Sequence, residues 1–170
     1  MKIRKIDTKR LATLSILVSL AMILSYVESL IPPLVAVPGV KLGLSNIATV
    51  FALYTLGVPS AVAVSIVRVA LSALLFGNFV SLLYSISGAV LALAFMVLLR
   101  RIKIFSSVGV SVAGGVAHNA GQIIAACLVM ENAAISLYFP PLIISGTLAG
   151  VAIGAAAGIL VKKTEKILKM

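Results

Sequence analysis

Long apolar runs, separated by short polar or Pro/Gly-containing segments, divide the chain into six predicted helices. Runs of about 18 or more apolar residues are typical of helices that cross the roughly 30 Å hydrocarbon core of a membrane. We expect helices at about residues 11–30, 43–56, 60–76, 80–99, 106–130 and 141–161. The pattern therefore predicts an all-α integral membrane protein, a six-transmembrane-helix bundle that forms a single membrane domain over residues 1–170.

The second predicted helix is shorter than the others. It begins after Pro38-Gly39 and ends at the Gly57-Val58-Pro59 turn. A helix of about 15 residues spans only about 22 Å at 1.5 Å per residue, which is less than the thickness of the hydrocarbon core. We therefore expect this helix to be shielded by its neighbours or to start below the outer surface.

The positions of the charged residues predict how the bundle is oriented in the membrane. The chain is 62% hydrophobic and only 11% charged, with a net charge of +10. Lys and Arg near the ends of spans stay preferentially in the cytoplasm, and six spans return the chain to its starting side, so we expect both termini to be cytoplasmic. Twelve of the fourteen basic residues form three clusters at the edges of apolar runs: Lys2, Arg4, Lys5, Lys9 and Arg10; Arg100, Arg101 and Lys103; and Lys162, Lys163, Lys166 and Lys169.

The same charge distribution argues against a nucleic-acid-binding protein, which would gather its basic residues on one face beside stacking aromatic side chains. Catalysis by the chain alone is also not expected. Asp7 is the only aspartate of a chain with four acidic residues, whereas magnesium-dependent phosphoryl or prenyl chemistry uses clustered carboxylates. Cys127 and His118 are single residues of their kinds, so we expect no disulfide, no metal site and no cofactor.

Arg68 is the most informative polar residue, because it lies near the middle of the third predicted helix. An arginine at this depth costs about 2.5–3.5 kcal/mol on insertion scales and is too far from either interface to reach water easily. Two interpretations remain open. Arg68 forms a buried ion pair, for which Glu28 is a candidate partner, or it contacts a ligand.

The fifth predicted helix carries His118, Asn119 and Gln122 near mid-membrane. Residues 118 and 122 share a face because they are four positions apart. The three side chains form hydrogen bonds between helices or line a polar cavity. Tyr84, on the fourth helix, and Lys41 and Asn46, at the mouth of the second, are further candidates for such a cavity.

Small residues recur at every fourth position of the last two helices. Such stripes let helix backbones approach closely. They serve either internal packing or the docking of another membrane protein. The stripes are Gly109, Ala113, Ala117, Gly121 and Ala125 in the fifth helix, and Gly146, Gly150, Gly154 and Gly158 in the sixth.

Several landmarks together resemble a known family. They are E-x-x-I-P at residues 28–32, V-K-L-G-L-S-N-I at residues 40–47, the G-x-P turn at residues 57–59 and the basic residue within the third helix. This pattern resembles the substrate-binding S components of energy-coupling factor (ECF) vitamin transporters. More closely, the chain resembles the membrane family named heptaprenyl diphosphate synthase component I, also called Gx transporters. The resemblance covers essentially the whole chain.

The resemblance implies a bundle that binds a small vitamin-like or precursor molecule from outside and works with a transmembrane coupling subunit and two cytoplasmic ATPases. In that family a small-residue stripe on the first helix meets the coupling subunit, and the corresponding residues here are Ala12, Ser15 and Ser19. The chain lacks the D-D-x-x-D motif that a prenyl synthase would use.

We therefore expect a substrate-binding importer subunit, multi-pass in the plasma membrane of a bacterium. The alternatives are a non-catalytic accessory protein of isoprenoid or quinone synthesis and a stand-alone ion-coupled transporter. The expected ligand-binding residues are Glu28, Lys41, Asn46, Arg68, Tyr84, His118, Asn119 and Gln122.

Overall fold

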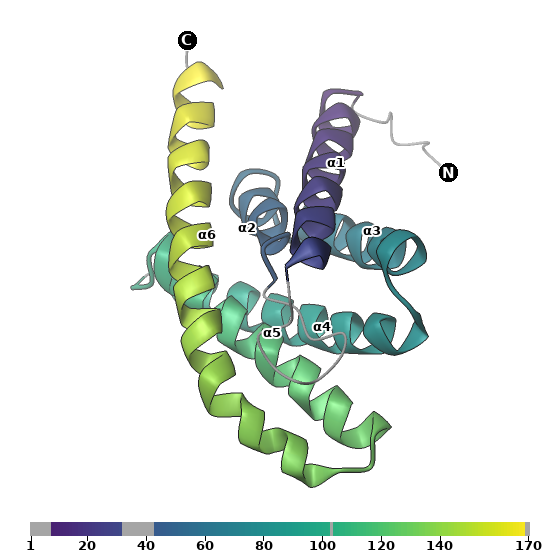
Figure 1. The fold of residues 1–170 in the computed structure, drawn as a ribbon. Coiled ribbons are helices and arrows are strands. Elements are labelled where there is room, and N and C mark those ends of the chain that lie inside the picture. Colours follow the sequence, from purple (N-terminus) through teal and green to yellow (C-terminus); the bar gives the residue numbers. More distant parts are fainter. Residues whose placement is uncertain (1–7, 32–42, 103, 169–170) are drawn as a thin grey trace, which may run out of the picture.

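The computed structural model describes residues 8–31, 43–102 and 104–168, and the regular secondary structure of this part of the chain is entirely helical. The helices, labelled in Figure 1, are α1 (Thr8–Leu30), α2 (Asn46–Thr55), α3 (Val58–Phe76), α4 (Phe79–Arg101), α5 (Ser107–Val129) and α6 (Phe139–Leu168), with a 3-10 helix η1 (Ala133–Tyr138) before α6. The predicted all-helical fold with six helices is confirmed. Lys41 lies outside the described residues.

Five helical segments of the described residues are long and apolar enough to cross a membrane: α1, α3, α4, α5 and the segment that combines η1 with α6. The exception is α2, whose 10 residues give about 15 Å of helix at 1.5 Å per residue. Most of its side chains are buried, because α2 packs against α1, α3 and α6. The short second helix is thus shielded by protein, as the sequence predicts.

Several helix boundaries differ from the predicted ones, and those of α2 and α6 matter most for the site and the shape of the bundle. Residues 43–45 form a turn, so α2 begins only at Asn46. At the other end of the chain, α6 starts at Phe139 and continues to Leu168, beyond the apolar run that defined the prediction. In Figure 1 the C-terminal part of α6 extends past the rest of the bundle.

The most extensive helix contacts join α4 to α5 and α5 to α6. α5 is therefore the central element of one half of the molecule, and half of the residues in its most apolar window are buried. α1, α2 and α3 form the other half, joined to the first by α2–α6 and α3–α4 contacts. α1 lies at the margin, with long apolar side chains such as Ile16 and Ile23 exposed.

The glycines of α6 explain how closely α5 and α6 approach. A Cβ atom at Gly150 would lie 2.5 Å from the Cα of Val112, and one at Gly154 would lie 2.6 Å from the Cα of Val108. Backbone can lie this close only where the side chain is absent, which is the physical basis of small-residue stripes between membrane helices. Gly150 and Gly154 therefore serve packing between α6 and α5 of the same chain.

The small residues of α5 are divided between two neighbours. Gly121 faces α4, since a Cβ there would lie 2.5 Å from the carbonyl oxygen of Ser87. Gly115, which is outside the predicted stripe, faces α6. A Cβ atom at Gly115 would lie 2.5 Å from the carbonyl oxygen of Gly146. These two glycines of α5 therefore serve internal packing, one against α4 and one against α6.

Contacts near the helix ends place Arg10 and Arg100 at one end of the bundle. Arg10, in α1, donates from Nη2 to the Oγ of Ser60 at the start of α3, over 2.7 Å. Arg100, at the end of α4, lies over the ring of Tyr54 near the end of α2, 5.2 Å from its centroid. The start of α1 and the end of α6 also lie on the same side in Figure 1. The assignment of this end to the cytoplasm stays a prediction.

Candidate functional site

Arg68 is buried in the bundle, 5% exposed, and holds the start of α2. Its Nη1 donates to the Oγ of Ser45 over 2.5 Å, and its Nη2 donates to the Oδ1 of Asn46 over 3.1 Å. Ser45 is the N-cap residue of α2, but its side chain does not cap the helix. The hydroxyl oxygen is therefore available to the guanidinium, which joins α3 to α2.

Glu28 reaches the same turn from α1. Its side chain is 5% exposed, and its Oε1 accepts a hydrogen bond from the backbone N–H of Gly43. Gly43 has φ of +82°, and a Cβ there would lie 2.8 Å from the Nδ2 of Asn46, so a glycine suits this position on two counts. The turn before α2 is thus bound by an anion from α1 and a cation from α3.

His118 and Gln122 approach this turn from α5. Both are buried, and they lie on one helix face because they are four residues apart. The imidazole of His118 lies between two glycines. A Cβ at Gly43 would lie 3.3 Å from its Cδ2, and a Cβ at Gly88 would lie 2.8 Å from its Cε1 and Nδ1. The ring therefore fits a slot between α4 and the turn before α2.

These groups enclose one small polar space. The space left between the side chains is about 10 Å³, and a cavity needs roughly 10–15 Å³ on this measure to hold one water molecule. In this conformation the site is closed around at most one water. The residues that line it are Ser25, Glu28, Gly43, Ser45, Arg68, Ser72, Ser85, His118 and Gln122.

Four of the predicted ligand-binding residues line this space, and the remaining described ones lie elsewhere. Asn46 contacts it through Arg68. Asn119 instead donates from Nδ2 to the carbonyl oxygen of Leu142, over 2.7 Å, and so joins α5 to α6. Tyr84 is 1% exposed and packs in a hydrophobic cluster with Ile123 and Ile135. The structure does not bring Asn119 and Tyr84 to the polar space.

The sequence interpretation missed two of the serines that line the space, Ser25 and Ser72. Ser25 precedes Glu28 by three residues on α1, and Ser72 follows Arg68 by four residues on α3. This spacing places each serine on the helix face of the neighbouring charge. The spacing was a usable signal, although serine in a membrane helix often serves only its own backbone, as the 3.4 Å bond from Ser72 Oγ to the Val69 carbonyl oxygen illustrates.

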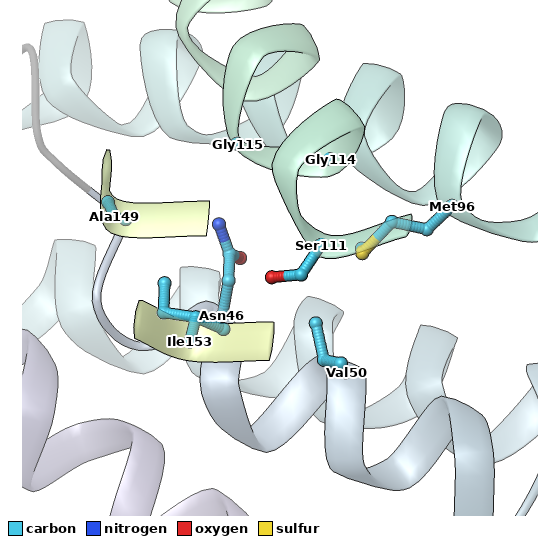
Figure 2. Close-up of a pocket in the computed structure, with 9 residues that line it drawn as sticks. Asn46, Val50, Met96, Ser111, Gly114, Gly115, Ala149 and Ile153 are labelled. Atoms are coloured by element: carbon cyan, nitrogen blue, oxygen red, sulfur yellow. The ribbon is translucent and has the colours of Figure 1, made fainter. Parts of the chain in front are cut away.

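A second, mainly apolar space adjoins the first. It is also about 10 Å³. Gly43 lines both spaces, and Asn46 lines the second while its Oδ1 accepts from Arg68. Figure 2 shows the side chains of Asn46 and Ser111 directed into this space from α2 and α5. Its other lining residues are Val50, Met96, Gly114, Gly115, Ala149 and Ile153.

Among the described residues no group of three or more His, Cys, Asp or Glu side chains could hold a metal ion. The buried carboxylate of Glu28 accepts a hydrogen bond from the turn before α2.

The predicted docking residues of α1 lie on its surface. Ala12, Ser15 and Ser19 are exposed, unlike Leu17, which packs in the core. The hydroxyls of Ser15 and Ser19 donate to carbonyl oxygens four residues earlier, over 3.1 and 3.0 Å. Such bonds satisfy the hydroxyls within the helix, so this face can contact lipid or the apolar surface of another protein.

Known proteins give two matches. A solved structure of the S component of a bacterial ECF transporter has a TM-score of 0.59 to this chain at 22% sequence identity, and the match covers 96% of this chain and 99% of the other. The two proteins therefore share a fold. No curated protein matches the chain. The family model of heptaprenyl diphosphate synthase component I matches residues 17–160, and the chain belongs to that family.

Proposed function

We propose that the chain is the substrate-binding membrane subunit of an ECF-type importer, which captures a small vitamin-like or precursor molecule from outside. The observation that carries this proposal is the enclosed polar space, to which α1, α3 and α5 contribute Glu28, Arg68, His118 and Gln122, inside a bundle with the fold of an S component. Buried ionisable groups in a membrane bundle commonly mark a substrate path.

The closed geometry suggests how the site works. Because the space holds at most one water molecule, a ligand needs neighbouring groups to move apart. The turn at Gly43–Asn46 is the element to which Glu28 and Arg68 are bonded. A ligand that replaces these bonds would release the start of α2, and its departure would restore them.

The proposed partners are a transmembrane coupling subunit and two cytoplasmic ATPases, in the plasma membrane of a bacterium. The exposed α1 face with Ala12, Ser15 and Ser19 is the proposed docking surface for the coupling subunit. Small side chains allow a second helix to approach closely there. ATP hydrolysis by the partners would supply the energy for release of the ligand inside.

A second candidate function follows from the family name. The chain could assist a separate prenyl diphosphate synthase without taking part in its chemistry. The fold match to a transporter component favours the importer, and the absence of a metal-binding carboxylate cluster among the described residues gives no support to catalysis.

Affinity purification of the tagged full chain from its native membranes tests the proposal. The importer predicts that two ATPases and a membrane coupling protein co-purify. Ser15→Leu should reduce their recovery by adding bulk to the α1 face. Ala94→Leu, which adds the same bulk at an exposed position of α4, is the matched control and should not. Recovery of a prenyl synthase without any ATPase would instead support the accessory role.

A further inference from the structure

We propose that the polar space takes a small zwitterion, whose anionic group binds Arg68 and whose cationic group binds Glu28. The inference rests on the proposed substrate-binding function and names its ligand class. It begins from the two opposite charges, which come from different helices and line one enclosed space. Both side chains are 5% exposed, so solvent screens neither of them effectively.

The guanidinium of Arg68 is incompletely satisfied. Its hydrogen bonds in the described part of the chain go to Ser45 and Asn46, which are neutral acceptors. Its Nε is buried and has no hydrogen-bond partner there. A guanidinium is a planar fork of donors that matches a carboxylate with two parallel bonds. A carboxylate ligand would therefore form stronger bonds with Arg68 than the hydroxyl and amide that it now contacts.

The sum of charges selects between an anion and a zwitterion. Apart from His118, the described lining residues carry one positive charge, on Arg68, and one negative charge, on Glu28. A simple anion would leave the space with an uncompensated negative charge, which is unfavourable away from water. A ligand that carries both charges leaves the sum at zero. Its ammonium group could take the place of the Gly43 N–H as a donor to Glu28.

The adjoining apolar space indicates where the rest of the ligand would lie. It shares Gly43 with the polar space, and Asn46 lies between Arg68 and this second space. Val50, Met96 and Ile153 give it an apolar wall. If the turn before α2 moves aside, the two spaces join into a cavity with an ionic end and an apolar end. Such a cavity fits an amino acid with an apolar side chain.

Three probes of nearly the same shape test whether the ligand must carry both charges. L-leucine carries both charges, 4-methylpentanoate is the same skeleton without the amino group, and 3-methylbutylamine is the same skeleton without the carboxylate. Binding to the purified full-length chain in detergent would be measured by competition with radiolabelled leucine and by the shift in thermal unfolding midpoint. We expect leucine to bind at least tenfold more tightly than either singly charged analogue.

Charge-removing variants should change the order of the probes. Glu28→Gln keeps the side-chain size and should move the preference at least tenfold toward 4-methylpentanoate. Arg68→Gln should move it toward 3-methylbutylamine. Ser136→Ala, which removes a hydroxyl from an exposed position of η1 outside both spaces, is the control and should keep the wild-type order. If the charge variants do not fold, the three probes on the wild-type chain still decide the question.

Two outcomes would overturn the zwitterion. One is wild-type binding of 4-methylpentanoate as tight as that of leucine, and the other is no binding of leucine, phenylalanine or glycine at millimolar concentration. Either outcome leaves the importer function intact if ATPases still co-purify with the chain. If no ATPase co-purifies but the probes bind in the expected order, the importer function is contradicted and the zwitterion site is supported.

Discussion

Gly150→Ala tests whether the α5–α6 contact depends on the missing side chain. The new Cβ would lie 2.5 Å from the Cα of Val112 and 3.0 Å from the carbonyl oxygen of Ser111. Carbon atoms in favourable contact are about 3.5–4.0 Å apart, so the helices must separate by about 1 Å. The atoms in the way belong to the backbone of α5 and cannot turn aside. Every contact on both sides of Gly150 would be loosened by this separation.

The magnitude follows from two opposing effects. Overpacking a well-packed interior costs about 1–3 kcal/mol, and backbone contacts correspond to the upper part of that range. Replacing glycine by alanine inside a helix returns about 1 kcal/mol. We therefore expect Gly150→Ala to lower the free energy of unfolding by about 1–2 kcal/mol. Gly158→Ala, in the same stripe, would meet mainly the Oγ of Ser107 at 2.9 Å, which can rotate, so we expect no loss and a gain of at most about 1 kcal/mol.

Reversible unfolding in mixed detergent micelles, followed by far-ultraviolet circular dichroism, measures both variants against the wild type. The reasoning predicts a lower midpoint for Gly150→Ala alone. Equal changes in the unfolding midpoints of the two variants would show that the effect comes from replacing glycine by alanine in a helix, and not from the close contact of Gly150 with α5. A Gly150→Ala chain at least as stable as the wild type would refute the close-packing account directly.

Two further side chains give expectations of the same kind. Asn119→Ala removes the hydrogen bond to the Leu142 carbonyl and should lower the free energy of unfolding by about 0.5–1.5 kcal/mol without weakening leucine binding; weaker binding at unchanged stability would place Asn119 in the ligand site after all. Asn78→Ala removes the N-cap of α4, which accepts from the backbone of Ser81 over 2.8 Å, and should lower the unfolding midpoint by the equivalent of about 1 kcal/mol. The control is Asn132→Ala, which removes a comparable cap from the short exposed helix η1; an equal loss there would mean that the position of the cap in the bundle is unimportant.

The helices could be predicted from the sequence because membrane spans leave a strong apolar pattern, and Arg68 was found because a charge at that depth is exceptional. The relative placement of polar groups was harder to predict. His118 and Gln122 point to the same space because they lie four residues apart, whereas Asn119 is turned by about 100° from His118 in a helix of 3.6 residues per turn. It consequently faces α6 and the Leu142 carbonyl.

The other predicted and observed residues around the polar space gave weaker signals in the sequence. Tyr84 has a polar group, but its apolar ring fills a hydrophobic cluster. Gly43 and Gly88 leave room for the His118 ring because they have no side chain. The sequence alone does not show which glycines have this role. Ser25 and Ser72 become informative only when their spacing from Glu28 and Arg68 is considered together with the enclosed space.

The shielding of α2 has a consequence for how the protein responds to its lipid environment. None of the side chains of Asn46–Thr55 is fully exposed, so protein rather than hydrocarbon surrounds this helix. Spanning helices tilt or distort the bilayer when their apolar length and the bilayer thickness differ. We expect α2 to be largely exempt from this hydrophobic mismatch, because it is too short to cross the bilayer and packs mainly against other helices. We therefore expect that α2 can shift at the proposed ligand site without a change in the boundary between protein and lipid, while membrane thickness acts on the five longer candidate spans.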